Sequence, residues 1–218
     1  MTIIEFNKMM ANGMRNKSGT PLTEEEIELV KSEIRAIGAD EDVFIFNDEE
    51  HMKKSTCYNW QNDKIYVTRN IFPDVNSGSI HPRDIMSVRA VLAHEYYGHR
   101  PHHDEYESDY KIDKDFHTIP LWQDEQRASL EAAEKCKNLT AMDRRDLVLD
   151  VIYRAEEAGH VAEMTDFMKE TLYGYSKEER NISPNLNCNP IKHCNLARFE
   201  NLNLPQFSQS QTNNEFSK

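Results

Sequence analysis

VLAHEYYGHRPHH, residues 91–103, is the stretch that decides the expected fold and site. A His-Glu pair followed one turn later by a second His is how a helix offers two imidazoles and a carboxylate to one zinc ion. The stretch therefore predicts zinc ligation by His94 and His99, with Glu95 as the general base. The preceding residues are apolar on nearly every side, so we expect one buried helix from His81 to His99 that Pro101 ends.

The spacing of the two histidines differs from the usual one. Two histidines four residues apart lie about 40° apart around a helix, whereas five residues place His94 and His99 about 140° apart. A π-type bulge between Tyr96 and His99 is therefore expected, since it brings both imidazoles to one side. Gly98 is the residue that adopts an unusual backbone most easily there.

Two other interpretations of the histidines stay open at this point. On a regular helix Glu95 and His99 share a face, and His99 would chelate a metal with His102 or His103 instead. Alternatively, the histidines are simply solvated. Residues 99–117 are polar and charged without periodicity, which predicts a surface loop.

The third ligand is expected from DEQRAS (124–129), near the start of a helix predicted at 121–136. Glu125 is the candidate, because its helix face continues with small residues that let another backbone approach closely: Ala128, Ser129 and Ala132. Asp124 is placed to accept a hydrogen bond from the free N–H of a ligand histidine. The competing interpretation is an ordinary acidic helix start, which the helix dipole favours.

The rest of the chain predicts an α+β domain with a small antiparallel sheet before the active-site helix and a helical C-terminal part. A capping box of Thr23 and Glu26 begins a helix that runs from about Glu24 to Ile37 and stops at Gly38. DVFIF (42–46) is expected to be a strand, and TCYNW (56–60) and KIYVTRNIF (64–72) a hairpin.

Two further helices are expected towards the C-terminus. Thr140, with Asp143 three residues later, caps a helix that stops at Gly159, and residues 161–173 form another. We therefore divide the chain into a polar lead-in (1–20), one domain (21–175) and a polar tail (176–218). The tail is rich in Asn, Ser and Gln, and we expect it to be disordered from about Phe207.

Composition excludes several classes of function. The formal net charge of -12 argues against general nucleic-acid binding, which needs clustered Lys and Arg. No apolar run is long enough for a membrane span, and the first twenty residues lack a classical secretory signal. A cytoplasmic protein is expected, or one exported by a dedicated secretion system. Cys188 and Cys194 flank His193 and form a second candidate metal or disulfide site, although reduced thiols are the expected state.

Four motifs in order resemble the zincin-like metallopeptidase domains of bacterial polymorphic toxins: HEYYGH (94–99), DEQRAS (124–129), AA (132–133) and RAEEAG (154–159). The first two are also similar to motifs of dipeptidyl peptidase III. The resemblance covers about residues 60–160. It implies a zincin-like fold, Zn²⁺ ligation by His94, His99 and Glu125, and catalysis by Glu95. Gln126 departs from the aromatic residue of the toxin domains.

The resemblance implies a zinc-dependent peptidase that cleaves a protein or peptide substrate. A toxin or effector role, with an inhibitory immunity protein as partner, is part of that expectation. The strand DKIYVTR (63–69) is the expected edge for an extended substrate. The candidate oxyanion donors are Tyr97, Arg127, Tyr153 and His160. The alternatives are a zinc hydrolase of a non-peptide substrate and a non-enzymatic interaction protein stabilised by zinc.

Overall fold

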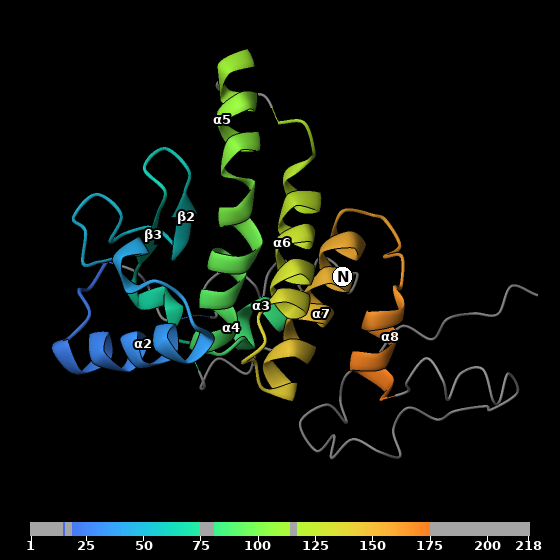
Figure 1. The fold of residues 1–218 in the computed structure, drawn as a ribbon, viewed down its shortest axis with the longest axis horizontal. Coiled ribbons are helices and arrows are strands. Elements are labelled where there is room, and N and C mark those ends of the chain that lie inside the picture. Colours follow the sequence, from blue (N-terminus) through green and yellow to red (C-terminus); the bar gives the residue numbers. More distant parts are fainter. Residues whose placement is uncertain (1–14, 16–18, 75–80, 114–116, 175–218) are drawn as a thin grey trace, which may run out of the picture. The chain divides into compact units, whose positions relative to one another are not determined.

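The structure, a computed structural model, describes residues 15, 19–74, 81–113 and 117–174 and is α+β, with helices around a small three-stranded sheet (Figure 1). Most of the lead-in, the tail and the Cys188–Cys194 segment lie outside the described residues, and so do the expectations placed on them. No helix in the described ranges is long and apolar enough to cross a bilayer.

Helix α2 (Glu24–Ile37) has the predicted limits. The Thr23 hydroxyl accepts from the Glu26 N–H, and the Glu26 carboxylate accepts from the Thr23 N–H, so the capping box is confirmed. Gly38 ends the helix at φ 73°, a left-handed conformation that suits glycine. One apolar face packs inward and comprises Ile27, Val30, Ile34 and Ile37.

The sheet contains β1 (Phe44–Phe46), β2 (Cys57–Asn59) and β3 (Lys64–Val67) in the order β1-β3-β2. The hairpin of β2 and β3 is confirmed, but β1 pairs parallel with β3, so the expectation of an antiparallel sheet is wrong for that pair. DKIYVTR (63–69) is likewise wrong as the edge. It contains the central strand, whose residues 65–67 are all buried, and the edge beside the predicted site is β2.

The single helix expected from His81 to His99 is interrupted. A first short helix, α3, spans Pro82–Ile85 and ends at Met86, whose ψ of 136° is not helical. A second helix, α4, then spans Val88–Ala93. Ser87 causes a new start, because its Oγ accepts from the Ala90 N–H. The same hydroxyl donates to Asp143 Oδ1 at 2.6 Å, so the turn between α3 and α4 is bonded to the helix that contains Asp143.

The loop expected at 99–117 is mostly helix. A 3-10 turn η4 (Arg100–His102) leads into α5 (His103–Ile112), so Pro101 does not end the helical segment. It lies in the first turn, where the missing N–H has no intrahelical partner to lose. The polar sequence gives no apolar stripe, because α5 meets its neighbour through hydrogen bonds and ion pairs instead of an apolar face.

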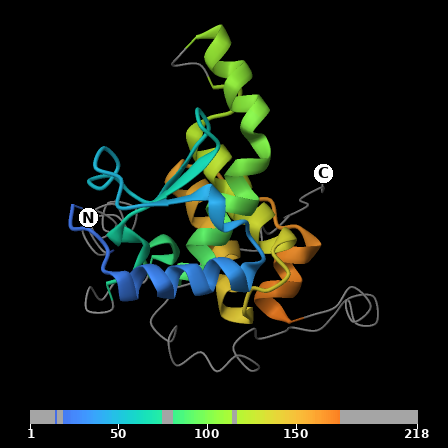
Figure 2. The ribbon, with the colours of Figure 1, turned by 60° about the vertical axis from the view of Figure 1, so that its left-hand side comes forward.

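The C-terminal part contains α6 (Leu121–Lys135), α7 (Ala141–Glu157) and α8 (Asp166–Tyr173). The limits of α6 and the capping box of Thr140 and Asp143 agree with the prediction. Helix α8 is shorter than predicted, because Thr165 caps it and residues 161–165 precede it without helical structure. Figure 1 shows α6 between α5 and α7, and Figure 2 shows the same fold turned by 60°.

Candidate metal centre

Among the described residues, one group of three potential ligands converges: His94, His99 and Glu125 each offer one atom, and these atoms lie within 4.8 Å of one another. The Nε2 atoms of the two histidines are 3.1 Å apart. His94 Nε2 is 3.3 Å from Glu125 Oε2, and His99 Nε2 is 3.8 Å from Glu125 Oε1. Ligands around a tetrahedral zinc ion stand about 3.3 Å apart, so the three side chains fit this ion.

The two histidines converge because the backbone between them is not a regular α-helix. Residues His94–His99 form a π-helix, η3, which confirms the predicted widening. Gly98 lies within η3, but its φ is not positive, so the left-handed freedom of glycine is not used there. Glycine is needed there for close packing instead, because a Cβ at this position would lie 2.4 Å from the carbonyl oxygen of Ala128.

The face of α6 that carries small side chains makes this close contact with Gly98. Three of its residues are almost completely buried against η3 or α7: Ala128, Ser129 and Ala132. The backbones of η3 and α6 therefore approach closely enough for Glu125, at the start of α6, to reach both ligand histidines.

A hydrogen-bond chain determines which nitrogen of His94 carries the proton. Ser129 Oγ donates to Asp150 Oδ2 at 2.6 Å, so the hydroxyl can only accept from His94 Nδ1, 3.0 Å away. Despite burial, the charge of Arg154 keeps the pKa of Asp150 below its ordinary value, which makes that carboxylate an acceptor. His94 is therefore protonated on Nδ1, and its Nε2 lone pair points into the cluster.

A second chain of the same kind supports His99. The Tyr106 hydroxyl donates to Asp124 at 3.0 Å and accepts from His99 Nδ1 at 3.0 Å. Asp124 Oδ2 also lies 3.5 Å from His99 Nδ1, so the carboxylate predicted to support a ligand histidine does so mainly through the tyrosine. Although burial lowers it, hydrogen bonds to Asp124 and Glu125 raise the pKa of His99 to about 10, so without a metal ion this imidazole is a cation. A bound metal ion would displace the Nε2 proton, and Nδ1 would keep its hydrogen bond to Tyr106.

The two Nε2 atoms and the Glu125 carboxylate thus face one point, an arrangement that suits a bound metal cation. Arg154 Nη2 lies 3.0 Å from Glu125 Oε2. Against the effect of burial, hydrogen bonds from His94 and His99 and the charge of Arg154 hold the pKa of Glu125 well below its ordinary value. Deprotonated carboxylate and neutral imidazoles are the states in which these groups bind zinc.

Glu95 lies beside the cluster without belonging to it. Its Oε2 accepts a hydrogen bond from the Tyr58 N–H of β2 at 2.8 Å, which ties the carboxylate to the sheet edge. Burial raises the pKa of Glu95 above its ordinary value, although the nearby His99 and His94 lower it. A buried carboxyl with a raised pKa is suited to exchanging a proton near neutral pH.

The cluster opens into a cavity of about 800 Å³. Residues 53–58 of the β2 region form one side, and residues of α5 and the start of α6 form another. Ligand atoms and Glu95 are therefore accessible to a molecule in the cavity, although their side chains are largely buried.

The other histidines lie elsewhere. His102 is bound between Glu105 and Glu131, and His103 Nδ1 is 2.9 Å from the Tyr58 hydroxyl. Neither belongs to the cluster, so the alternative chelate of His99 with one of them is not the arrangement in the structure.

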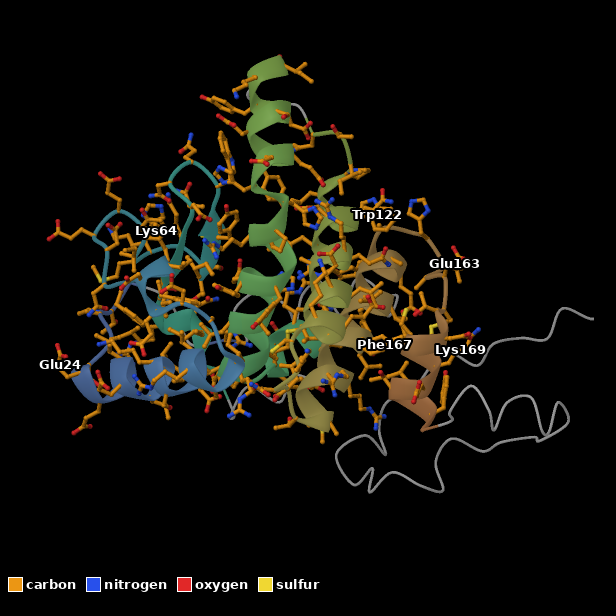
Figure 3. All side chains as sticks on the ribbon, in the orientation of Figure 1. Glu24, Lys64, Trp122, Glu163, Phe167 and Lys169 are labelled. Carbon is orange, nitrogen blue, oxygen red and sulfur yellow. The ribbon has the colours of Figure 1, made fainter. Side chains whose placement is uncertain are left out.

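The four candidate oxyanion donors are mostly remote from the cavity. Tyr97 donates to the Ile37 carbonyl, and Tyr153 packs edge-on against His81. His160 stacks on Trp122, which Figure 3 labels near the start of α6. Arg127 is the one of the four that lines the cavity, where it pairs with Glu105 and Asp124.

Sequence reasoning missed Arg154, Asp150, Tyr106 and Tyr58. Arg154 lies within the quoted RAEEAG motif and Asp150 stands one helical turn before it, so an acidic and a basic residue at i, i+4 was an available signal. Tyr106 had none, because its segment was expected to be a loop.

Comparison of the chain with protein-family models, with curated proteins and with solved structures gives no match.

The first hydrogen-bond chain leads to a prediction for Ser129→Ala. The change removes the acceptor of the His94 N–H, so zinc affinity should fall about 10–100-fold, the usual effect of losing such a supporting group. Competition with a chromophoric chelator measures it. Ser32→Ala, on the exposed face of α2, is the matched control. Equal affinities for the two variants would contradict the role of Ser129.

Proposed function

We propose that the protein is a zinc-dependent peptidase with a zincin-like arrangement of its helices and sheet edge. The observation that carries the proposal is the convergence of the two imidazole Nε2 atoms and the Glu125 carboxylate beside Glu95, in a cavity. His94, His99 and Glu125 would hold the ion. Bound zinc supplies Lewis acidity, which lowers the pKa of water and polarises a carbonyl group.

Glu95 is the proton-handling group of the proposed reaction. Its carboxylate takes a proton from the attacking water and passes it to the leaving amine. The Tyr58 N–H keeps the side chain on the cavity side of β2, so the carboxylate needs little reorganisation. Arg154 holds Glu125, and the two hydrogen-bond chains hold the imidazoles in the required tautomers.

An extended peptide is the substrate that suits this cavity. Strand β2 is a sheet edge, and its residues lie along one wall. An edge strand can recognise a peptide through main-chain hydrogen bonds, with alternate side chains in pockets. The N–H groups of Thr56 and Tyr58 already donate to Asn70 and Glu95, so they are not among the groups offered to a peptide. The proposed toxin or effector role and the inhibitory partner rest on the motif resemblance.

Zinc analysis and cleavage of a mixed peptide library test the proposal together. The purified protein should contain one zinc per chain, cleave the library, lose activity on chelation and regain it with zinc. A fully zinc-loaded protein that leaves the library intact would overturn the peptidase function.

A further inference from the structure

The cavity continues along β2 on both sides of the candidate catalytic group. At one end the Thr56 N–H donates to Asn70 Oδ1, and the Asn70 carbonyl accepts from Arg15. Two residues further the Tyr58 N–H bonds Glu95, and two residues further again Trp60 begins the turn that follows the strand. Two residues of a strand span about 6.6 Å. Residues 56–58 and Trp60 form one wall of the cavity, and Glu95 is bonded to Tyr58, in the middle of this wall.

The far end of this wall is aromatic. Trp60 and Tyr110 line the cavity with ring centroids 5.0 Å apart. Tyr110 lies one helical turn after Tyr106, whose hydroxyl contacts His99, and Trp60 lies two residues after Tyr58, whose N–H contacts Glu95. The aromatic pair therefore lies in the same cavity as the cluster, further along both α5 and the β2 segment.

Two further apolar side chains line the same cavity, Ile119 and Leu121. Leu121 is 68% exposed and Tyr110 is 47% exposed. Single exposed apolar residues are ordinary, whereas several that line one cavity indicate a surface for an apolar group of a ligand. Glu105 and Asp109 line the same cavity from α5, where Glu105 is paired with Arg127 and Asp109 with Thr118, so an apolar side chain finds its contacts with the aromatic pair and not with these acids.

We infer that the Trp60–Tyr110 pair is a specificity subsite for a large aromatic or branched aliphatic side chain of the substrate, on one side of an internal peptide bond that is cleaved. The inference rests on the proposed peptidase function. Internal cleavage follows because the wall extends beyond Glu95 in both directions, which leaves room for chain on both sides of the bond.

Peptides blocked at both termini test this inference. Matched peptides with Phe, Leu, Ala or Asp at a single variable position are compared by kcat/KM, and mass spectrometry gives the cleaved bond. The wild type should prefer Phe and Leu over Ala by about 10–100-fold, the usual discrimination of an apolar pocket. Asp should be the poorest of the four.

Trp60→Ala and Tyr110→Ala should each reduce the Phe-to-Ala ratio about 10-fold, and Trp60→Phe should restore much of it. Met142→Ala, an exposed apolar residue of α7 outside the cavity, should leave the ratio unchanged. Zinc content verifies that the variants fold. A wild type that cleaves without apolar preference, or only unblocked peptides, would overturn the inference and leave the peptidase proposal intact. A wild type that cleaves nothing would overturn both.

Discussion

Glu95→Gln should keep the fold and the zinc while lowering peptide cleavage about 10²–10⁴-fold, the range typical for general-base catalysis. Glutamine has nearly the same shape, and its side-chain oxygen can still accept from the Tyr58 N–H, so the local structure should survive. It cannot take a proton from water at neutral pH. The measurements are zinc content, melting temperature and library cleavage for both forms.

Glu107→Gln is a suitable control for this change. Glu107 lies on the same polar helix α5 that borders the cavity, but it pairs with Lys111 at the surface and does not line the cavity. Its cleavage rate should equal that of the wild type. Equal cleavage by the Glu95 variant would remove Glu95 from the mechanism. If the chain is a toxin, Glu95→Gln should also relieve toxicity without reducing the amount of protein.

Alanine in place of His94, His99 or Glu125 should remove the zinc. Loss of a group that only supports a ligand reduces affinity about 10–100-fold, so loss of a ligand should exceed about 100-fold. Elemental analysis after gel filtration measures the metal, and circular dichroism verifies the helices.

The double variant His102→Ala/His103→Ala is the control for the three ligand variants. These histidines bond to Glu105, Glu131 and Tyr58 and do not face the cluster, so the zinc should stay. A double variant without zinc, beside a His94→Ala protein that keeps it, would contradict the ligand assignment.

The two helices with a full capping box were predicted correctly from the sequence, whereas the single-sided caps Ser87 and Thr165, which start α4 and α8, were missed. The capping boxes at Thr23 and Thr140 determine where α2 and α7 begin, because both partners of each bond lie within four residues. The five-residue spacing of His94 and His99 likewise contains the information for the π-helix.

Features that depend on distant partners were not predictable in this way. Helix α5 has no apolar periodicity, and its support comes from α6 through Tyr106–Asp124 and Glu105–Arg127. The parallel pairing of β1 with β3 follows from tertiary packing. The requirement for glycine at position 98 was not predictable either, because it comes from contact with the Ala128 backbone, thirty residues away in the sequence.

The π-helix at His94–His99 also determines how α5 is rotated about its axis relative to α4. Each residue of a helix advances the chain by about 100° and 1.5 Å. Deleting one residue from η3 would restore the common four-residue spacing of the histidines, yet it would rotate α5 by roughly that angle relative to α4. Tyr106 and Tyr110 would then turn away from the cavity. The extra residue therefore couples the orientation of the candidate ligands to that of the α5 side of the cavity, so a change in one alters the other.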